Sequence, residues 1–300
     1  MWLSLAFLSA LLLGAYDTCK KASLNGNAVI PVLLLNTLFC SLLFLPVILL
    51  SAFAPHIIQD TIFYVPAADL RTHLYIFIKA CIVLSSWLFA YFATKHLPIT
   101  IAAPIKASQP ILTLIGAMVI YGEVLNLYQW IGVSLAIIAF ILLSISGKKE
   151  GINFRHNAWI LFIVLATITG AMSGLYDKYL MSHGFHRMTV LVWYSYYQLA
   201  LMAVISLIMW YPKRKTTTPF VWRNSIFFIS FFLVCADFVY FYALSEPESM
   251  ISIVSMVRRS SVVVSFTAGA LIFREKNIKS KAIDLLLVLL GMLFLYLGTK

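Results

Sequence analysis

Charged residues are scarce in this 300-residue chain, where Asp, Glu, Lys and Arg together make up 11%. A soluble domain carries about 25%. Acidic residues are the scarcest, with 11 Asp and Glu beside 22 Lys and Arg. No polar stretch is long enough for a catalytic or nucleic-acid-binding domain, so these shortages exclude a soluble protein. The formal charge of +11 is therefore expected at the ends of membrane segments, not on a nucleic-acid-binding face.

The sequence also lacks motifs for catalysis or metal binding. Cys19, Cys40, Cys81 and Cys235 are scattered through apolar runs without the paired spacing of a zinc or redox site, which indicates packing residues. The six histidines fall at loops or helix borders, and no Ser-His-Asp order or nucleotide-binding glycine loop is present. We therefore expect no enzyme activity, no metal and no cofactor. Transport by this chain would run on a substrate or ion gradient.

Long hydrophobic runs are what the chain has in abundance, since 62% of its residues are hydrophobic. A helix needs about 20 apolar residues to cross a bilayer core. Ten runs qualify: 2–19, 28–53, 72–94, 99–121, 127–146, 157–181, 188–210, 222–244, 249–272 and 280–298. The sequence thus predicts an all-α integral membrane protein with ten transmembrane helices.

The distribution of cations predicts an orientation. Fourteen Lys and Arg, with Lys20 and Lys281 among them, are assigned to loops after the odd-numbered segments, and five, including Lys79, to the opposite side. Cytoplasmic loops carry the excess of Lys and Arg, which places both termini outside. The three remaining cations lie within predicted helices: Lys106, Arg258 and Arg259.

The chain contains an internal repeat. A shift of 160 residues lays Gly14-Ala15-Tyr16-Asp17 on Gly174-Leu175-Tyr176-Asp177. A shift of 152 residues lays Ile105-Lys106-Ala107-Ser108 on Val257-Arg258-Arg259-Ser260. The matches mark corresponding helices of two halves, predicted as residues 1–148 and 155–300. Because each half has five helices, an odd number, the second must enter the membrane inverted, as in secondary transporters.

The second register also aligns Tyr121-Gly122-Glu123 with Phe273-Arg274-Glu275, and we expect Glu123 and Glu275 to be structural acids at the membrane interface. Together with the two Tyr-Asp helix ends, this pattern resembles the EamA group of the drug/metabolite transporter superfamily, although Arg274 replaces the usual glycine. The resemblance implies a central cavity lined by the first, third, fourth, sixth, eighth and ninth helices. It does not imply one substrate.

Charged side chains at membrane depth point to the binding site, because each costs at least ~2.5–3.5 kcal/mol on insertion scales and must face protein or a watery cavity. Lys106, Arg258, Arg259 and Asp237 meet this condition. The cations could merely pair with Asp237 to tie helices together. Three cations beside one acid favour instead an anionic ligand. Lys106 and the Arg258-Arg259 pair are also similar to the phosphate-gripping residues of plastid-type sugar-phosphate translocators.

Polar and aromatic side chains at helical spacing could complete the cavity, with ordinary packing as the alternative for each aromatic residue. The candidates are Gln109, Ser255, Trp87, Tyr91, Tyr16 and Tyr176. Asp17 and Asp177 recur in the repeat near membrane borders, where a gate, a helix cap or a coupling-ion site are all consistent with the sequence.

The leading hypothesis is a secondary carrier of small anionic or zwitterionic metabolites, such as organic phosphates, carboxylates or amino acids, working by alternating access. The expected partners are a small-molecule substrate and the lipid bilayer of a bacterial inner membrane, with no nucleic acid and with a homodimer left open. The alternatives are an exporter of neutral or cationic compounds, a channel and an intramembrane enzyme.

Overall fold

The computed structural model describes residues 2–121, 126–148, 152, 154–245, 257–275 and 277–298. Regular structure in these residues is entirely helical, which confirms the predicted all-α class. The helices of the first half are α1 (Trp2–Leu24), α2 (Val29–Phe53), α3 (Pro55–Ile58), α4 (Leu70–His96), α5 (Ile99–Ala107), α6 (Gln109–Tyr121) and α7 (Leu127–Lys148). Those of the second half are α8 (Ala158–Ser182), α9 (Arg187–Ile205), the π-helical η1 (Ser206–Trp210), α10 (Ser225–Ser245), α12 (Ser261–Leu271) and α13 (Ile278–Leu297).

Several helices have the length and composition of membrane spans. Four meet both criteria: Val29–Phe53, Leu70–His96, Ala158–Asp177 and Arg187–Trp210. Helix α7, outside these four, has an apolar outer face. Its Ile137, Ile141 and Ile145 recur every four residues and are half exposed. Residues at this spacing share one helix face, so α7 presents a continuous apolar stripe to its surroundings.

The predicted count of ten helices is not confirmed by the described residues. A short additional helix, α3, lies in the connection between α2 and α4. The segment predicted as one helix, 99–121, is two helices interrupted at Ser108. Helix α1 also continues beyond the predicted 2–19 to Leu24, so Lys20 belongs to a helix and not to a loop.

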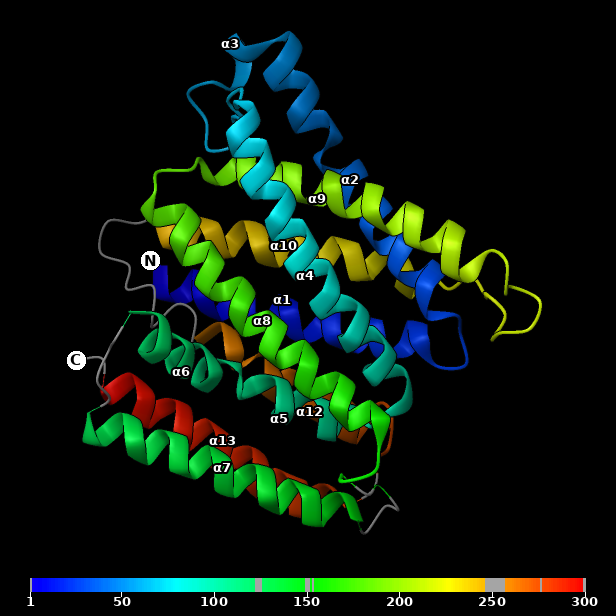
Figure 1. The fold of residues 1–300 in the computed structure, drawn as a ribbon, viewed down its shortest axis with the longest axis vertical. Coiled ribbons are helices and arrows are strands. Elements are labelled where there is room, and N and C mark those ends of the chain that lie inside the picture. The colour runs from blue at the N-terminus through cyan, green and yellow to red at the C-terminus, as the bar shows by residue number, and fades with distance from the viewer. Residues whose placement is uncertain are drawn as a thin grey trace.

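The two halves interlock along helix seams, chiefly α1·α10, α7·α13 and α4·α8. Helix α1 packs against α10 of the other half, and α4 packs against α8, as Figure 1 shows. Serine hydroxyls bridge the α1·α10 and α4·α8 seams: Ser9 donates to the Ala236 carbonyl and Ser86 donates to the Ala166 carbonyl, at 2.7 and 2.8 Å. In Figure 1, α1 runs from the label N at the left toward the right, and α8 runs from the right back toward the left. The corresponding helices of the halves therefore run in opposite directions.

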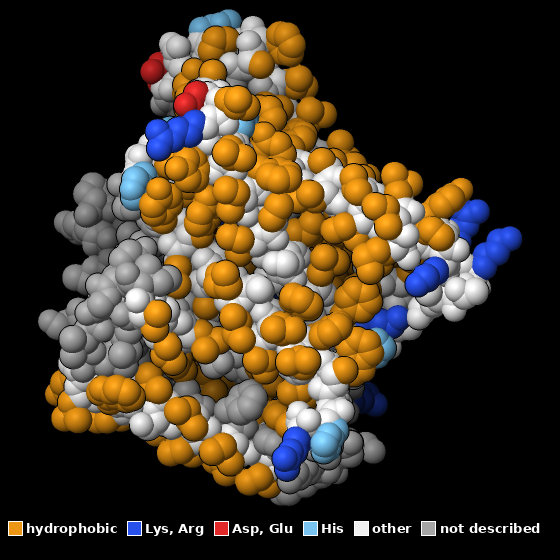
Figure 2. Space-filling view, in the orientation of Figure 1, with side chains coloured by type: hydrophobic (Ala, Val, Ile, Leu, Met, Phe, Trp, Pro, Cys, Tyr) orange, Lys and Arg blue, Asp and Glu red, His pale blue; other side chains and the backbone are white. Residues whose placement is uncertain are grey.

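The interior between α1, α2, α4, α9 and α10 is filled by apolar side chains. Tyr16, Leu33, Leu84, Met202 and Ile229 belong to one buried cluster there. The outer surface is also apolar. Figure 2 shows hydrophobic side chains over most of the visible face, with Lys and Arg gathered at its edges. This distribution is that of a protein surrounded by lipid.

The N-terminus of α5 is capped from the other half. The carboxylate of Glu275 accepts the backbone N–H groups of Ile99 and Thr100 at 2.7 and 2.9 Å, and it also accepts the Thr100 hydroxyl. Lys281 Nζ donates to the same hydroxyl at 2.8 Å and is fully buried. An acid at a helix N-terminus satisfies free N–H groups and complements the helix dipole. Glu275 thereby fixes where α5 begins, and with it the position of Lys106.

Candidate substrate-binding site

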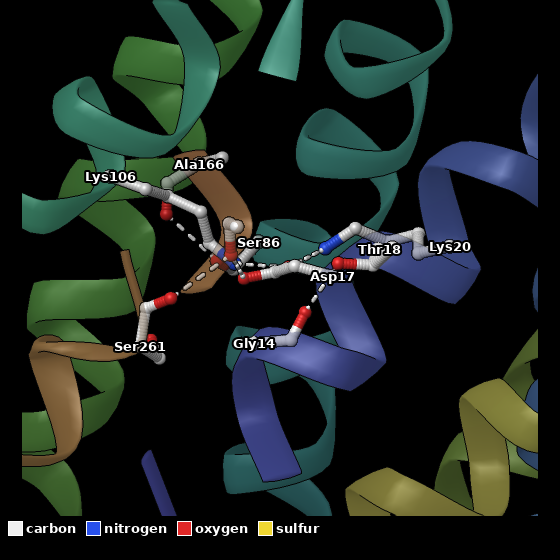
Figure 3. A network of polar contacts seen from close by, with 9 residues as sticks. Gly14, Asp17, Thr18, Lys20, Ser86, Lys106, Ala166 and Ser261 are labelled. Carbon is white, nitrogen blue, oxygen red and sulfur yellow. Dashed lines mark hydrogen bonds and ion pairs between the residues drawn. The ribbon is translucent and has the colours of Figure 1, made fainter. Parts of the chain in front are cut away.

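Lys106 lies at the end of α5, directly before the helix break. Pro110 has no N–H to give to the Lys106 carbonyl, and the loss of this hydrogen bond favours a helix break there. Ser108 closes the last turn, because its hydroxyl donates to the Ile105 carbonyl at 2.6 Å. The break directs Lys106 toward α1, where Figure 3 shows its side chain extending to Asp17.

The matching segment of the second half has the same break. Residues 257–259 are helical, Ser260 forms a turn, and α12 follows from Ser261. The Ser260 hydroxyl donates to the Val257 carbonyl, again at 2.6 Å. Arg258 and Arg259 therefore stand before a helix interruption as Lys106 does.

Asp17 of α1 is the centre of a polar cluster drawn in Figure 3. Lys20, one turn further along α1, forms an ion pair with its Oδ1. Lys106 Nζ lies 3.9 Å from the same oxygen, and the Ser265 hydroxyl of α12 lies 3.5 Å from Oδ2. The Lys20 side chain is 2% exposed, whereas that of Lys106 is 29% exposed. One carboxylate thus serves a buried lysine and a more accessible one.

Arg258 and Asp237 form a second ion pair, between the middle of the ninth predicted segment and α10. The Tyr194 hydroxyl donates to Asp237 Oδ2 at 3.3 Å. The Arg258 guanidinium also lies 4.2 Å from the centre of the Tyr240 ring, a cation–π distance. Its Nε is buried without a hydrogen-bond partner among the described residues. Arg258 is therefore held mainly by protein groups.

Lys106 and Arg259 differ from Arg258 in having almost no partners. Neither makes a hydrogen bond to any residue that the structure describes, and the only ion pair of Lys106 is the 3.9 Å contact with Asp17. Arg259 lies close enough to Arg258, Asp17 and Asp237 for their charges to act on it. These two cations keep donors that a ligand could use.

The other predicted residues fall into two groups. Tyr16 and Tyr91 lie next to the Asp17 cluster, since Lys20 Nζ is 4.4 and 5.6 Å from their ring centres. Trp87 packs partly buried against the same core, and Tyr91 is fully buried with no partner for its hydroxyl within the described residues. Gln109 is buried at the start of α6, where its amide lies against Gly170 of α8.

Tyr176 lies apart from these residues. Its hydroxyl donates to the Tyr75 carbonyl at 3.2 Å, and its ring packs with Tyr179. Ser255, also predicted for the site, lies outside the described residues. Of the predicted residues, Lys106, Tyr16 and Tyr91 thus lie around Asp17, and Arg258 lies at Asp237.

Sequence reasoning assigned three buried lysines to loops, and these assignments were wrong. Lys20 pairs with Asp17 inside α1, Lys281 is buried in α13, and Lys79 lies within α4 with 4% of its side chain exposed. Lys79 forms an ion pair with Asp177 of α8, across the halves. The expectation of three interior cations beside one acid therefore included too few buried cations and too few acids.

A simple signal identifies one of these missed residues. Lys79 stands well inside the apolar run 72–94, where the cost of a buried charge alone marks it as a candidate. Lys20 gives no such signal, because it adjoins Lys21 at the end of an apolar run and looks like an interfacial anchor.

The charged groups of the site are suited to binding an anion. Its donors are two lysines and two arginines, and its carboxylates are already paired with them. Within the described residues, no three His, Cys, Asp or Glu side chains are grouped to hold a metal ion. Ammonium and guanidinium groups at membrane depth bind anions, the guanidinium in bidentate fashion.

The fold and this charged interior define a class: helical integral membrane proteins built from two repeated halves around a polar centre. The model of the EamA-like transporter family matches residues 1–145 and again residues 157–297, and the chain belongs to this family. No curated protein matches this chain. A solved structure titled "Crystal structure of protein" shares the fold, with a TM-score of 0.66 at 13% identity over 99% of this chain and 97% of that one.

Proposed function

We propose that this chain is a secondary carrier that moves a small dianionic metabolite, such as a phosphate monoester or a dicarboxylate, by alternating access. One observation carries the proposal: Lys106 stands 3.9 Å from Asp17 Oδ1, Arg259 is within electrostatic reach of both, and neither cation is hydrogen-bonded to a described residue. A guanidinium and an ammonium with free donors suit one phosphate or carboxylate group.

The charge of the cluster supports a dianion. Four cations stand against two acids in it: Lys20, Lys106, Arg258 and Arg259 against Asp17 and Asp237. Buried charges are stable only when they are paired or solvated. A substrate with two negative charges would compensate the surplus of two.

The proposed membrane topology is ten crossings in two inverted halves of five, with both termini outside. The opposite directions of α1 and α8 support inversion, since they are the first helices of the two repeats. Rocking of the halves about the α1·α10 and α4·α8 seams would expose the cluster to each side in turn.

Counterflow into proteoliposomes that contain the purified chain tests the proposal. The labelled probes are inorganic phosphate, glucose 6-phosphate, malate and glutamate, with arginine and glucose as cationic and neutral probes. Saturable uptake of phosphate-bearing or dicarboxylate probes is expected, and Lys106→Ala and Arg259→Ala should each abolish it. Uptake confined to arginine or glucose would overturn the anion assignment in favour of an exporter of cationic or neutral compounds. Ohmic conductance without counterflow would indicate a channel.

A further inference from the structure

We infer that Asp17 is an internal counter-anion that the substrate must displace from Lys106, so that this carboxylate sets the affinity of the site for anions. The inference rests on the proposed function, because it concerns the same cations. Asp17 adjoins the cations, but its negative charge would repel an anionic ligand. The inference therefore gives Asp17 a positioning role and not a direct contact with the substrate.

The three contacts of Asp17 differ in closeness. Lys20 pairs with Oδ1 directly, whereas Lys106 Nζ stands 3.9 Å from that oxygen, beyond the usual 2.7–3.2 Å of a hydrogen bond. Ser265 approaches Oδ2 at 3.5 Å. Lys106 is therefore the loosest partner, held by charge without a hydrogen bond.

The loosest partner is also the most exposed. The Lys106 side chain is 29% exposed and that of Asp17 is 19% exposed, whereas Lys20 is enclosed. An anion can therefore reach Lys106 without separating Asp17 from Lys20. After this exchange Asp17 keeps a direct partner and Lys106 has gained one, so neither charge is left unpaired in the interior.

The empty site needs such a carboxylate. Lys106 lies within the electrostatic reach of Lys20, Arg258 and Arg259, all of the same sign. A cluster of cations without a counter-anion is costly in a low-dielectric interior. Asp17 offsets this cost while the site is empty, and for the same reason it competes with the substrate for Lys106.

The repeat supplies a matched control. Asp177 holds the position of Asp17 in the second half, at the corresponding point of α8. It pairs with Lys79 and not with Lys106. Neutralising Asp177 changes the net charge of the protein by the same amount as neutralising Asp17, but it frees no cation that the proposal assigns to the substrate.

Titration calorimetry with inorganic phosphate, on the purified full chain in detergent, tests the inference. The Asp17→Asn variant should bind phosphate at least about tenfold more tightly than the wild type, which is about 1.4 kcal/mol. Asp177→Asn should change the dissociation constant by less than about twofold, an effect within about 0.4 kcal/mol. Damage to the fold would weaken binding and cannot mimic this gain.

A double variant keeps the test decisive if Asp17→Asn fails to fold because Lys20 is stranded. Asp17→Asn combined with Lys20→Met removes the direct pair, retains the wild-type net charge and still frees Lys106. It too should bind phosphate more tightly than the wild type.

The possible results of these experiments distinguish the inference about Asp17 from the proposed function. Phosphate binding that Lys106→Ala abolishes but that neither Asp17 variant tightens would overturn the inference and leave the proposed function standing. Equal tightening by Asp177→Asn would also overturn it, because a general charge effect would then suffice. Absence of binding to the wild type for phosphate and malate alike would remove the proposed function itself.

Discussion

Ser108 and Ser260 make the same hydrogen bond in the two halves of the molecule. Each hydroxyl donates to the carbonyl three residues earlier, that of Ile105 or of Val257, at 2.6 Å in both cases. In both halves the helix is interrupted at this serine, directly after the cations of the site. Such a side-chain bond competes with the regular helical pattern and bends helices. The repeat has therefore preserved a local device that orients Lys106 and Arg258.

The two serines should nevertheless differ in importance. The first half has Pro110 to enforce the break, whereas the second half has Val262 at the matching position. Ser260→Ala should cost about 1 kcal/mol of stability, the net value of one hydrogen bond. It should also weaken phosphate binding, and Ser108→Ala should have a smaller effect on both. Thermal unfolding and calorimetry measure this, and restoration of binding by Val262→Pro in the Ser260→Ala background is the control.

Substitution of the two adjacent arginines should affect the stability of the protein differently. Arg258→Ala strands Asp237, a largely buried carboxylate, and should destabilise the protein by roughly 3–5 kcal/mol. Arg259→Ala removes a cation without a hydrogen bond and should leave the unfolding temperature unchanged or raise it, while abolishing anion transport. Thermal unfolding beside counterflow distinguishes them. Equal loss of stability in both variants would contradict the assignment.

The ion pair between Lys79 and Asp177 predicts an asymmetry. Asp177→Leu leaves Lys79 alone with 4% of its side chain exposed and should cost roughly 3–5 kcal/mol. Lys79→Met should cost less, because Asp177 is 38% exposed and water can solvate it. Combining the two substitutions should recover most of the stability. A double variant as unstable as Asp177→Leu would show that the pair is not what stabilises the α4·α8 contact.

The cap on α5 should matter for both stability and binding. Glu275→Ala removes the acceptor of two backbone N–H groups and should cost about 1–2 kcal/mol. Because α5 carries Lys106, phosphate affinity should fall as well. Asp69→Ala is the control, since Asp69 caps α4 by accepting the Thr72 N–H at 2.9 Å, far from the site along the chain. Thermal unfolding and calorimetry should show a loss of stability in both variants and a loss of affinity only for Glu275→Ala.

The Asp69 cap also predicts a pH effect. Its hydrogen bonds from Thr72 lower the pKa of the Asp69 carboxyl. Its contribution to stability is therefore complete above the ordinary carboxyl pKa and is lost as the pH falls through the lowered value. The stability lost between neutral and acid pH, measured by thermal unfolding, should therefore be smaller for Asp69→Ala than for the wild type.

The proposed orientation is tested at Thr216, in the exposed loop that joins η1 to α10. In a variant whose four native cysteines are replaced, Thr216→Cys should resist a membrane-impermeant thiol reagent in intact cells and react after the membrane is opened. The neighbouring Lys213-Arg214-Lys215 motivates this, because such clusters stay on the cytoplasmic side. Ready labelling in intact cells would reverse the topology.

The sequence was a good guide wherever apolar length decided the outcome. Each of the ten apolar runs contains helix in the described residues, because a bilayer core leaves the backbone few other ways to satisfy its hydrogen bonds. Breaks within a run were harder to see. The interruption at Ser108 has a sequence signal in Pro110, but the one at Ser260 has none, since a serine hydroxyl bonds to a carbonyl in many unbroken helices.

Only part of the site could be predicted from the sequence, and the reason is physical. Lys106, Arg258, Arg259 and Asp237 stand out because an isolated charge in an apolar run is costly. Which of them are paired depends on the distances between helices, and no single-residue rule gives those. The Lys79–Asp177 pair joins residues 98 positions apart, and the link from Lys106 to Asp17 also requires the break in the fourth predicted segment.

The interlocked seams have a consequence for how such a molecule could have arisen. Because α1 packs on α10 and α4 on α8, the first and third spans of each half lie mainly against the other half. A chain of five helices would therefore have no complete interior by itself. Its simplest stable form would be a pair of identical chains inserted in opposite directions, each covering the first and third spans of the other. Gene fusion would then have fixed the two orientations permanently and freed the copies to diverge, so that only one of the two equivalent aspartates now stands beside the cations.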